Sequence, residues 1–247
     1  VSAKDGGTFS GTIAAAGYSS STAGTSNYIA GVNAGNSITA GGNFNTVVGD
    51  EAGTAITTGD GNTAVGYQAL DANTTASNNT AMGYNAGAAV TTGVDNTFIG
   101  GLAGDATTDA DGNVAVGKSA LSGNVLGGAS VAIGKNALAA QNPASATSML
   151  NTAVGANAGL SVTTGIQNTL IGALSGDAIT TANNNTAVGK SSLSATTTGG
   201  ENTAVGTNAL ATNTTASNNT AVGTNALKVN TTGASNTAVG QAALQDN

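Results

Sequence analysis

The sequence predicts an all-β fold, a parallel β-solenoid of about 12 to 13 coils, each made of one 17-residue repeat. A unit that reads Asn-Thr-Ala-Val-Gly recurs at a fixed spacing along most of the chain, and such a period is typical of solenoids. Seventeen residues are too few for a helical hairpin, and the high content of Asn, Gly and Thr opposes helix formation. The segment before each glycine is instead short and rich in residues that favour strands.

The repeat is anchored on its glycine. Successive copies are 17 residues apart except for one step of 21, which carries four extra residues within 141–150, including the only proline, Pro143. Glycine adopts positive φ without strain, so we expect it to form a tight corner after each strand. The glycines are Gly49, Gly66, Gly83, Gly100, Gly117, Gly134, Gly155, Gly172, Gly189, Gly206, Gly223 and Gly240. The solenoid is expected to cover 27–247, and the irregular residues 1–26 to form a cap or a docking arm.

Each coil is predicted to contain two short strands. The first is the Thr-Ala-Val segment, and the second runs through the Ala-Leu or Ala-Gly pair that follows the glycine. The Thr-Thr stretch after this pair then turns the chain back. Equivalent strands would pair in parallel about 4.8 Å apart, so that twelve coils give a rod of roughly 58 Å.

Two neighbouring columns of the repeat are apolar or small. The residue before each glycine is apolar in every copy, and the residue before that is mostly alanine, with Val47, Phe98 and Leu170 as larger exceptions. Because side chains alternate along a strand, these columns face opposite sides, and a strand that is apolar on both faces is buried on both. A thin coil has only one interior, so we expect the second face to contact another chain, most simply in a parallel homotrimer. The core or oligomer column consists of Val65, Met82, Ile99, Val116, Ile133, Val154, Ile171, Val188, Val205 and Val222.

An asparagine begins nearly every repeat, with Ser130 in its place once. Stacked amides can hydrogen-bond from coil to coil and fix the register. We therefore expect a structural ladder at a turn rather than a binding site. Its members are Asn45, Asn62, Asn79, Asn96, Asn113, Asn151, Asn168, Asn185, Asn202, Asn219 and Asn236.

The composition excludes several classes of function. The chain has no Cys, His or Trp, and its five basic residues are all lysines. Disulfides, thiolate or imidazole metal sites and Ser-His or Cys-His nucleophiles are therefore impossible, and we expect no enzyme and no cofactor. The net charge of −7 does not favour nucleic acid. No stretch approaches the roughly 20 apolar residues that cross a bilayer, so this segment is not expected to insert into a membrane.

Two polar groups of residues are weaker candidates for binding sites. Asp105, Asp109 and Asp111 offer the oxygen ligands that Ca²⁺ prefers, although their spacing fits no established loop and a solvated acidic turn is the alternative. Pairs of threonines recur along the rod and could bind ice or a polysaccharide, or could simply serve the turns. The pairs are Thr57/Thr58, Thr74/Thr75, Thr91/Thr92, Thr163/Thr164, Thr180/Thr181, Thr197/Thr198, Thr214/Thr215 and Thr231/Thr232.

Four further residues carry aromatic or acidic side chains that could serve binding or catalysis. Tyr67 and Tyr84 occupy one column in consecutive coils, and they could contact a sugar or support cross-strand packing. Asp50 and Glu51 are adjacent carboxylates, but neighbours on a strand point apart, which does not favour acid–base catalysis.

The segment 130–140, SVAIGKNALAA, resembles the head repeats of trimeric autotransporter adhesins of the YadA-like type. NTAVGYQAL at 62–70 and NTAVGTNAL at 202–210 follow the same pattern, and the resemblance covers about 27–247. It implies a trimeric, left-handed parallel β-roll at the cell surface that binds host or environmental surfaces. The family's repeats are usually shorter than 17 residues. Phage tail fibres contain similar repeats.

Together these observations predict an extracellular, cell-surface or virion protein without catalytic activity. The leading expectation is a structural and adhesive fibre segment that assembles with itself and attaches to an unidentified receptor or polysaccharide. The alternatives are a phage tail-fibre segment or self-assembling filament subunit, and an ice- or polysaccharide-binding solenoid. Because the first residue is Val1 and residues 244–247 align with the middle of an earlier coil, we expect an excised piece or end-to-end stacking.

Overall fold

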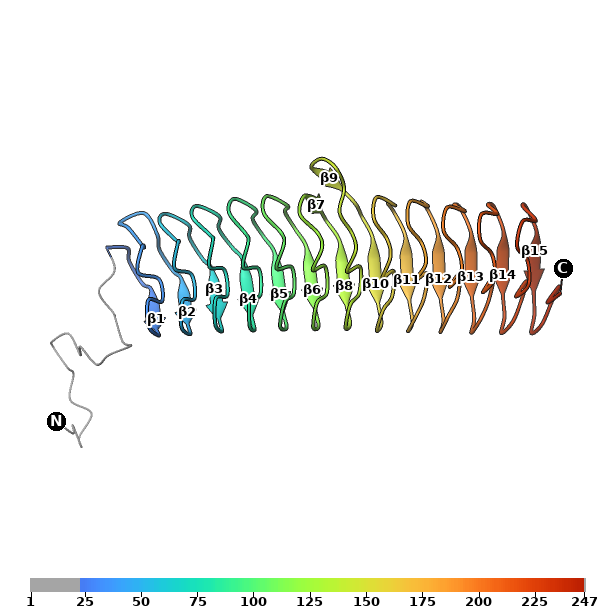
Figure 1. Ribbon diagram of the computed structural model, residues 1–247, viewed down its shortest axis with the longest axis horizontal. Helices are drawn as coiled ribbons and strands as arrows, with labels where there is room; N and C mark the ends of the chain where they lie inside the picture. Colours follow the sequence, from blue (N-terminus) through green and yellow to red (C-terminus); the bar gives the residue numbers. More distant parts are fainter. Residues whose placement is uncertain (1–22, 247) are drawn as a thin grey trace, which may run out of the picture.

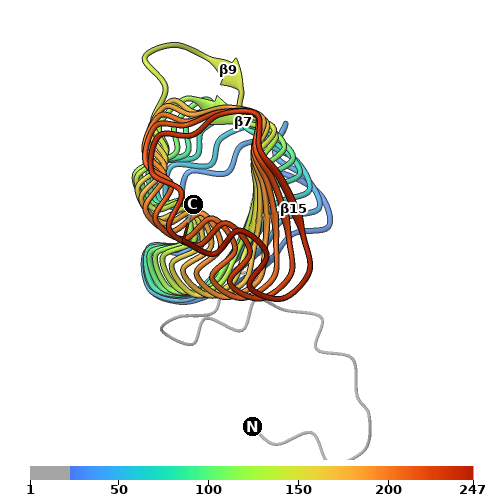
Figure 2. The ribbon, with the colours of Figure 1, turned by 90° about the vertical axis from the view of Figure 1, so that its right-hand side faces the viewer.

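A computed structural model describes residues 23–246 and contains no helix in that range. The chain winds into a rod of stacked coils (Figure 1), and the view along the rod shows the coils superposed on one closed outline (Figure 2). One strand per coil contributes to a 13-stranded parallel sheet. The structure thus confirms the predicted parallel β-solenoid of 17-residue coils. The predicted cap or docking arm falls largely on residues 1–22, outside the described residues.

The strands of the main sheet are three residues long and occupy the same place in each coil. Their pairing is in register, so that Thr63 lies beside Thr80 and Ala64 beside Ala81. The strands are β1 Tyr28–Ala30, β2 Thr46–Val48, β3 Thr63–Val65, β4 Thr80–Met82, β5 Thr97–Ile99, β6 Val114–Val116, β8 Val131–Ile133, β10 Thr152–Val154, β11 Thr169–Ile171, β12 Thr186–Val188, β13 Thr203–Val205, β14 Thr220–Val222 and β15 Thr237–Val239.

The predicted second strand is wrong. The Ala-Leu or Ala-Gly pair lies in a turn, because residues on either side of the alanine adopt left-handed backbone angles, as Gln68 (φ 53°) and Leu70 (φ 51°) do. A left-handed residue cannot continue a strand. These turns still join the coils through their backbone groups, since the Leu70 N–H donates to the Ala86 carbonyl oxygen at 3.1 Å.

The solenoid core is lined by the central residue of each strand. Ala64 and its equivalents are fully buried, whereas Val65 and its equivalents point outward and are half-buried or exposed. The core is therefore formed by the Ala64 column, and the Val65 column, expected to serve either the core or an oligomer contact, faces outward. A strand with apolar residues on both faces leaves its inward face undetermined, and here the smaller column fits inside because side chains from the turns fill the remaining space.

Two of the buried positions in each coil exchange volume with one another: the centre of the strand and the left-handed residue after the buried alanine. Leu70, Leu121, Leu138, Leu193, Leu210 and Leu227 fill the second position where the strand centre is alanine. A large strand centre occurs where glycine occupies the second position in its own coil and in the preceding described coil, as at Phe98 with Gly104 and Gly87. A Cβ at Gly104 would lie 2.4 Å from the Phe98 ring. The core is thus filled by exchanging volume between strand and turn.

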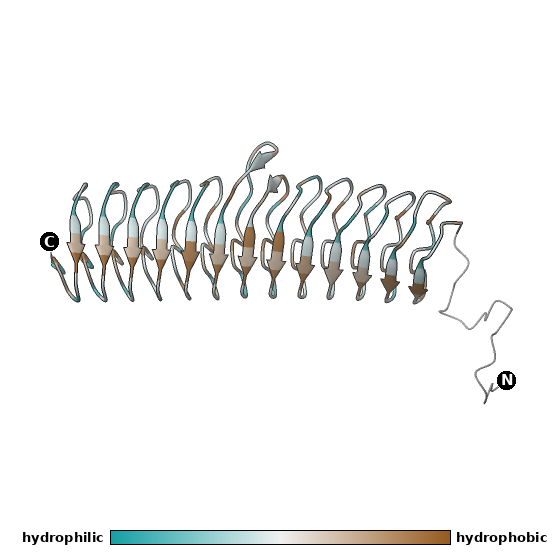
Figure 3. Ribbon diagram, turned by 180° about the vertical axis from the view of Figure 1, so that it is seen from behind, coloured by the Kyte–Doolittle hydropathy of each residue, from teal (hydrophilic) through white to brown (hydrophobic). Residues whose placement is uncertain are grey.

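The extra residues form an excursion from the rod without disturbing the sheet. Residues of this excursion form β9 (Thr147–Ser148), which pairs with β7 (Gly127–Gly128) in a separate two-stranded sheet. In Figure 2, β9 lies above the outline of the coils and β7 lies on it. The main sheet continues past the excursion, because β8 pairs with β10 with Val131 beside Thr152. Figure 3 shows hydrophobic residues at corresponding places in successive strands.

Candidate functional site

The predicted asparagine column forms a buried ladder. The Asn62 backbone N–H donates to Oδ1 of Asn45 at 2.9 Å, and the Asn62 Nδ2 donates to the Ala76 carbonyl oxygen at 2.9 Å. The same pair of bonds recurs along the rod and satisfies buried backbone groups at the start of each strand. These amides are therefore occupied by the fold.

Gln141 completes the ladder at the coil where serine replaces asparagine. The side-chain Oε1 of this buried glutamine lies 3.2 Å from Oγ of Ser130, which donates to it, and 3.0 Å from Nδ2 of Asn151, which also donates. Gln141 directly precedes the excursion. Sequence reasoning missed this role, although the coincidence of Ser130 with the irregular step of the repeat was a signal for a compensating polar residue.

The outward face of the main sheet is a regular surface that runs along the rod. Thr63 and Val65 flank the inward Ala64, and their equivalents form two columns along the sheet. Tyr28, Val114 and Val131 replace threonine in three coils, and no charged residue occurs in either column. Exposed members of the valine column include Met82 at 43%, Ile133 at 39% and Val222 at 36%. We call these two columns the outer Thr-Val face.

The threonine pairs have divided roles. They lie in bends rather than strands, and the first hydroxyl of several pairs donates to a carbonyl oxygen one coil on, as Thr57 does to Thr74 at 3.0 Å. The second members, such as Thr58 and Thr198, are exposed. The pairs therefore do not present two free hydroxyl columns.

The three aspartates do not form a cation site. Within residues 23–246 no group of three acidic side chains is arranged to hold a metal ion. Asp109 Oδ1 accepts hydrogen bonds from the hydroxyls of Thr92 at 2.6 Å and Thr91 at 3.0 Å, which lower its pKa. Asp111 Oδ1 accepts from the Val94 N–H at 2.7 Å. Asp105 is partly buried, and this burial raises its pKa.

The adjacent carboxylates are likewise engaged in structural bonds. Asp50 Oδ1 accepts from the Val32 N–H at 3.0 Å, and Glu51 Oε2 accepts from Nε2 of Gln68 at 2.8 Å. Both carboxylates therefore accept hydrogen bonds that join neighbouring coils of the rod.

Tyr67 and Tyr84 form a stacked pair on the surface. Their ring centroids are 5.7 Å apart, the ring planes differ by 13°, and 43% and 56% of the two residues are exposed. The negative charge of Glu51, with smaller contributions from burial and a side-chain hydrogen bond to Glu51, raises the pKa of Tyr67. The predicted aromatic column thus presents a hydrophobic and electron-rich surface.

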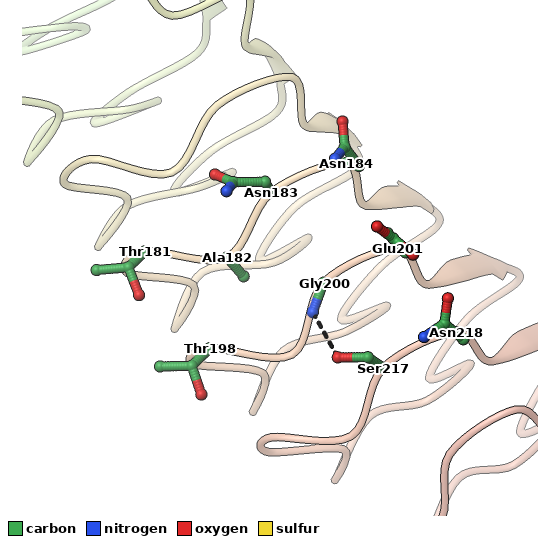
Figure 4. Close-up of a pocket in the computed structure, with 9 residues that line it drawn as sticks. All are labelled: Thr181, Ala182, Asn183, Asn184, Thr198, Gly200, Glu201, Ser217 and Asn218. Carbon is green, nitrogen blue, oxygen red and sulfur yellow. Dashed lines mark hydrogen bonds between the residues drawn. The ribbon is translucent and has the colours of Figure 1, made fainter.

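Two shallow grooves open at Gly128 and Gly200, which belong to the column two residues before the ladder position of the repeat. This column usually supplies an acceptor for the backbone N–H of the preceding coil, as Ser217 Oγ does for Gly200 at 3.1 Å. Gly200 supplies none, and a groove of about 280 Å³ opens there between Asn183 and Ser217 (Figure 4). A second groove, of about 360 Å³, lies at Gly128 beside the excursion. Amides, hydroxyls and Glu201 line the first groove, which suits a hydrogen-bonding ligand.

Comparisons with known proteins return no match: no protein-family model, curated protein or solved structure is similar to this chain. Among the described residues, no helix has the length and apolar character needed to span a bilayer.

Proposed function

We propose that this chain is a segment of an extracellular adhesive fibre, in which copies pack through the outer Thr-Val face and display the remaining surface for attachment. The observation that carries the proposal is the column of outward Val, Ile and Met side chains from β2 to β15 of the main sheet. An extended apolar surface on a soluble protein is typical of an interaction site.

The size of the outer face is sufficient for a stable interface. Thirteen strands at about 4.8 Å and three residues at about 3.3 Å give a footprint on the order of 600 Å². Two copies that cover this area on each other would bury on the order of 1,200 Å², which is within the range of specific interfaces. Neither column contains a charged residue, so no charge loses its hydration on assembly.

The repeat itself favours identical copies as partners. Each coil offers the same two columns with the same rise, so parallel copies placed side by side match threonine and valine positions at every step. Closed rotational symmetry gives such an assembly a fixed number of copies, and three copies around one axis cover the outer face of each copy. The resemblance to adhesin head repeats agrees with this arrangement, and a tail-fibre or filament subunit would use the same face.

A second candidate function is ice binding by the outer Thr-Val face. Its observation is the regular array of threonine hydroxyl and methyl groups at about 4.8 Å spacing on a sheet. This array replaces the threonine pairs as the relevant surface, since several of their first hydroxyls are bonded within the rod. The two functions exclude one another, because a face buried between copies is closed to ice.

Cysteine cross-linking tests the proposed assembly, because the chain has no natural cysteine. In parallel copies Val188→Cys places identical thiols opposite one another, and mild oxidation is expected to give cross-linked chains rapidly. The matched control is Thr198→Cys, which is exposed in the bend of the same coil and away from the outer face. Equal cross-linking of the two variants would contradict the proposal. Thermal hysteresis together with slow cross-linking of Val188→Cys would favour ice binding instead.

A further inference from the structure

We propose that Tyr84, Gly101 and Lys118 form a binding subsite for a pyranose ring that carries an acidic group, as found in acidic polysaccharides. The subsite gives the proposed attachment function a class of ligand, and in that sense it rests on that function. It lies outside the outer Thr-Val face, so binding and assembly can be measured separately.

The three residues belong to one column, the position directly after the repeat glycine. In consecutive coils this column reads Asp50, Tyr67, Tyr84, Gly101 and Lys118. Equivalent positions are about 4.8 Å apart along the rod. Tyr67 covers one face of the Tyr84 ring, and the stacking direction continues from Tyr84 toward Gly101. A third ring in this stack would therefore lie over Gly101.

Gly101 is not required by the backbone or by packing. Its φ is outside the left-handed region, and a Cβ built there would find no atom nearer than the Tyr84 carbonyl oxygen at 3.9 Å. The neighbouring Gly100 differs on both counts, with φ 130° and a Cβ position 2.7 Å from the backbone of Gly117. The effect of glycine at 101 is thus to leave the space beside Tyr84 open.

The width of this opening matches a single ring. Tyr84 and Lys118 are two coil steps apart, about 9.6 Å along the rod. A ring placed midway between Tyr84 and Lys118 would occupy the space that a side chain at position 101 would fill. The C–H bonds of a pyranose carry partial positive charge at hydrogen, and the face of an aromatic ring is negative, so the two surfaces attract.

The charges around the stack favour an acidic sugar bound on the Gly101 side. Lys118 and Lys135 follow in the same column, both are exposed, and neither forms an ion pair within residues 23–246. Asp50 and Glu51 lie at the opposite end, beyond Tyr67, and repel an anion there. On a chain of net charge −7, two lysines in consecutive coils beside an open aromatic face form a local site for a carboxylate or sulfate.

Affinity electrophoresis and calorimetry of the full chain with polygalacturonate test this inference, with dextran as the neutral probe. The unaltered protein is expected to bind polygalacturonate and not dextran. Gly101→Tyr fills the opening and is expected to weaken binding at least tenfold, and Lys118→Gln to weaken it severalfold and reduce its dependence on salt. The matched control is Ala173→Tyr, which adds the same ring at an exposed position of the same column elsewhere on the rod.

Three results would overturn the subsite: no binding by the unaltered protein, equal binding by Gly101→Tyr, or equal loss with Ala173→Tyr. Equal binding of dextran would overturn the acidic specificity. Light scattering on the same samples separates this inference from the proposed fibre. A monomer that binds polygalacturonate contradicts assembly and keeps the subsite, whereas a trimer that binds none keeps assembly and contradicts the subsite.

Discussion

Leu170 and Gly176 share one space in the core, because a Cβ on Gly176 would lie 2.7 Å from Cδ2 of Leu170. Leu170 is the centre of β11, and Gly176 is the left-handed residue of the following turn, with φ 55°. In the coil of β12 the same two places are held by Ala187 and Leu193. The two solutions fill one volume from opposite sides of the coil.

This relationship predicts that compensating substitutions rescue one another. Leu170→Ala opens a cavity and is expected to cost about 2–5 kcal/mol. Gly176→Leu alone overfills the coil and is expected to cost about 1–3 kcal/mol. The double variant places the residues of the β12 coil at these two positions, while Ile179 remains where that coil has Thr196. In chemical unfolding it is expected to lose less stability than the sum of the two single losses. A double variant with the summed loss would contradict shared volume.

Asn73 is a position where stability can be gained. Its amide is buried, and neither Oδ1 nor Nδ2 has a hydrogen-bond partner. At equivalent places the Thr107 hydroxyl donates to the Asn124 carbonyl oxygen at 3.0 Å, and the Thr196 hydroxyl donates to Asn213 at 2.9 Å.

We therefore expect Asn73→Thr to raise the free energy of unfolding by about 1 kcal/mol. Asn213→Thr is the control, because Nδ2 of Asn213 already donates to the Ala216 carbonyl oxygen at 3.0 Å. This control should show no gain in thermal unfolding. If both variants gain equally, the unpartnered amide of Asn73 is not the cause.

Asp105 and Asp177 occupy equivalent places in coils 72 residues apart, and partial burial raises the pKa of both. A carboxyl whose folded pKa exceeds its unfolded value favours the fold when protonated. That contribution is fully present below the unfolded pKa near 3.8 and is lost as the pH rises through the folded pKa. At neutral pH both carboxylates therefore weaken the fold.

Asp105→Asn/Asp177→Asn is thus expected to raise the melting temperature at pH 7 and to have little effect at pH 3. The control is Asp109→Asn, because hydrogen bonds from Thr92 and Thr91 lower the pKa of Asp109, so that its contribution has the opposite sign. Asp109→Asn should lower the melting temperature at pH 7. A neutral-pH loss in the Asp105/Asp177 variant would show that these carboxylates stabilise the rod.

Gln141 is expected to be required at the irregular coil. Its Oε1 accepts hydrogen bonds from Ser130 and Asn151, so Gln141→Leu leaves two buried donors without this acceptor. We expect a loss of about 1–3 kcal/mol in chemical unfolding. Gln141→Leu combined with Ser130→Ala removes one of these donors and should recover part of the loss. No recovery would indicate that the shape of Gln141 matters more than its bonds.

The sequence predicts those features of the fold that its period controls. Parallel pairing, coil length and the asparagine column follow from residues that recur every 17 positions. The second strand could not be excluded from sequence, because leucines such as Leu70 adopt left-handed angles that intrinsic preference disfavours. Which strand face points inward was also hidden while both faces were apolar, although the exchange of Phe98 against glycines 87 and 104 carried that information.

The candidate surfaces were predicted less completely. The tyrosine pair follows from a column of the repeat. Alternation shows that the alanine and valine columns face opposite sides, but it does not show which of them faces outward. The groove at Gly200 and the opening at Gly101 depend on missing side chains. A glycine in a repeat first indicates a turn, and only its φ and the free space around it show that the backbone does not need it.

The central claim is that the outer Thr-Val face is an interface between copies of this chain, and its most direct test is the solution mass by light scattering. We predict three times the 23.1 kDa of one chain for the unaltered protein. Val188→Asp/Val205→Asp, which puts charges on this face, should give one chain with an unchanged circular dichroism spectrum. Thr181→Asp/Thr198→Asp, with the same charges in exposed bends, should remain trimeric. A mass of one chain for the unaltered protein at every concentration would contradict the account.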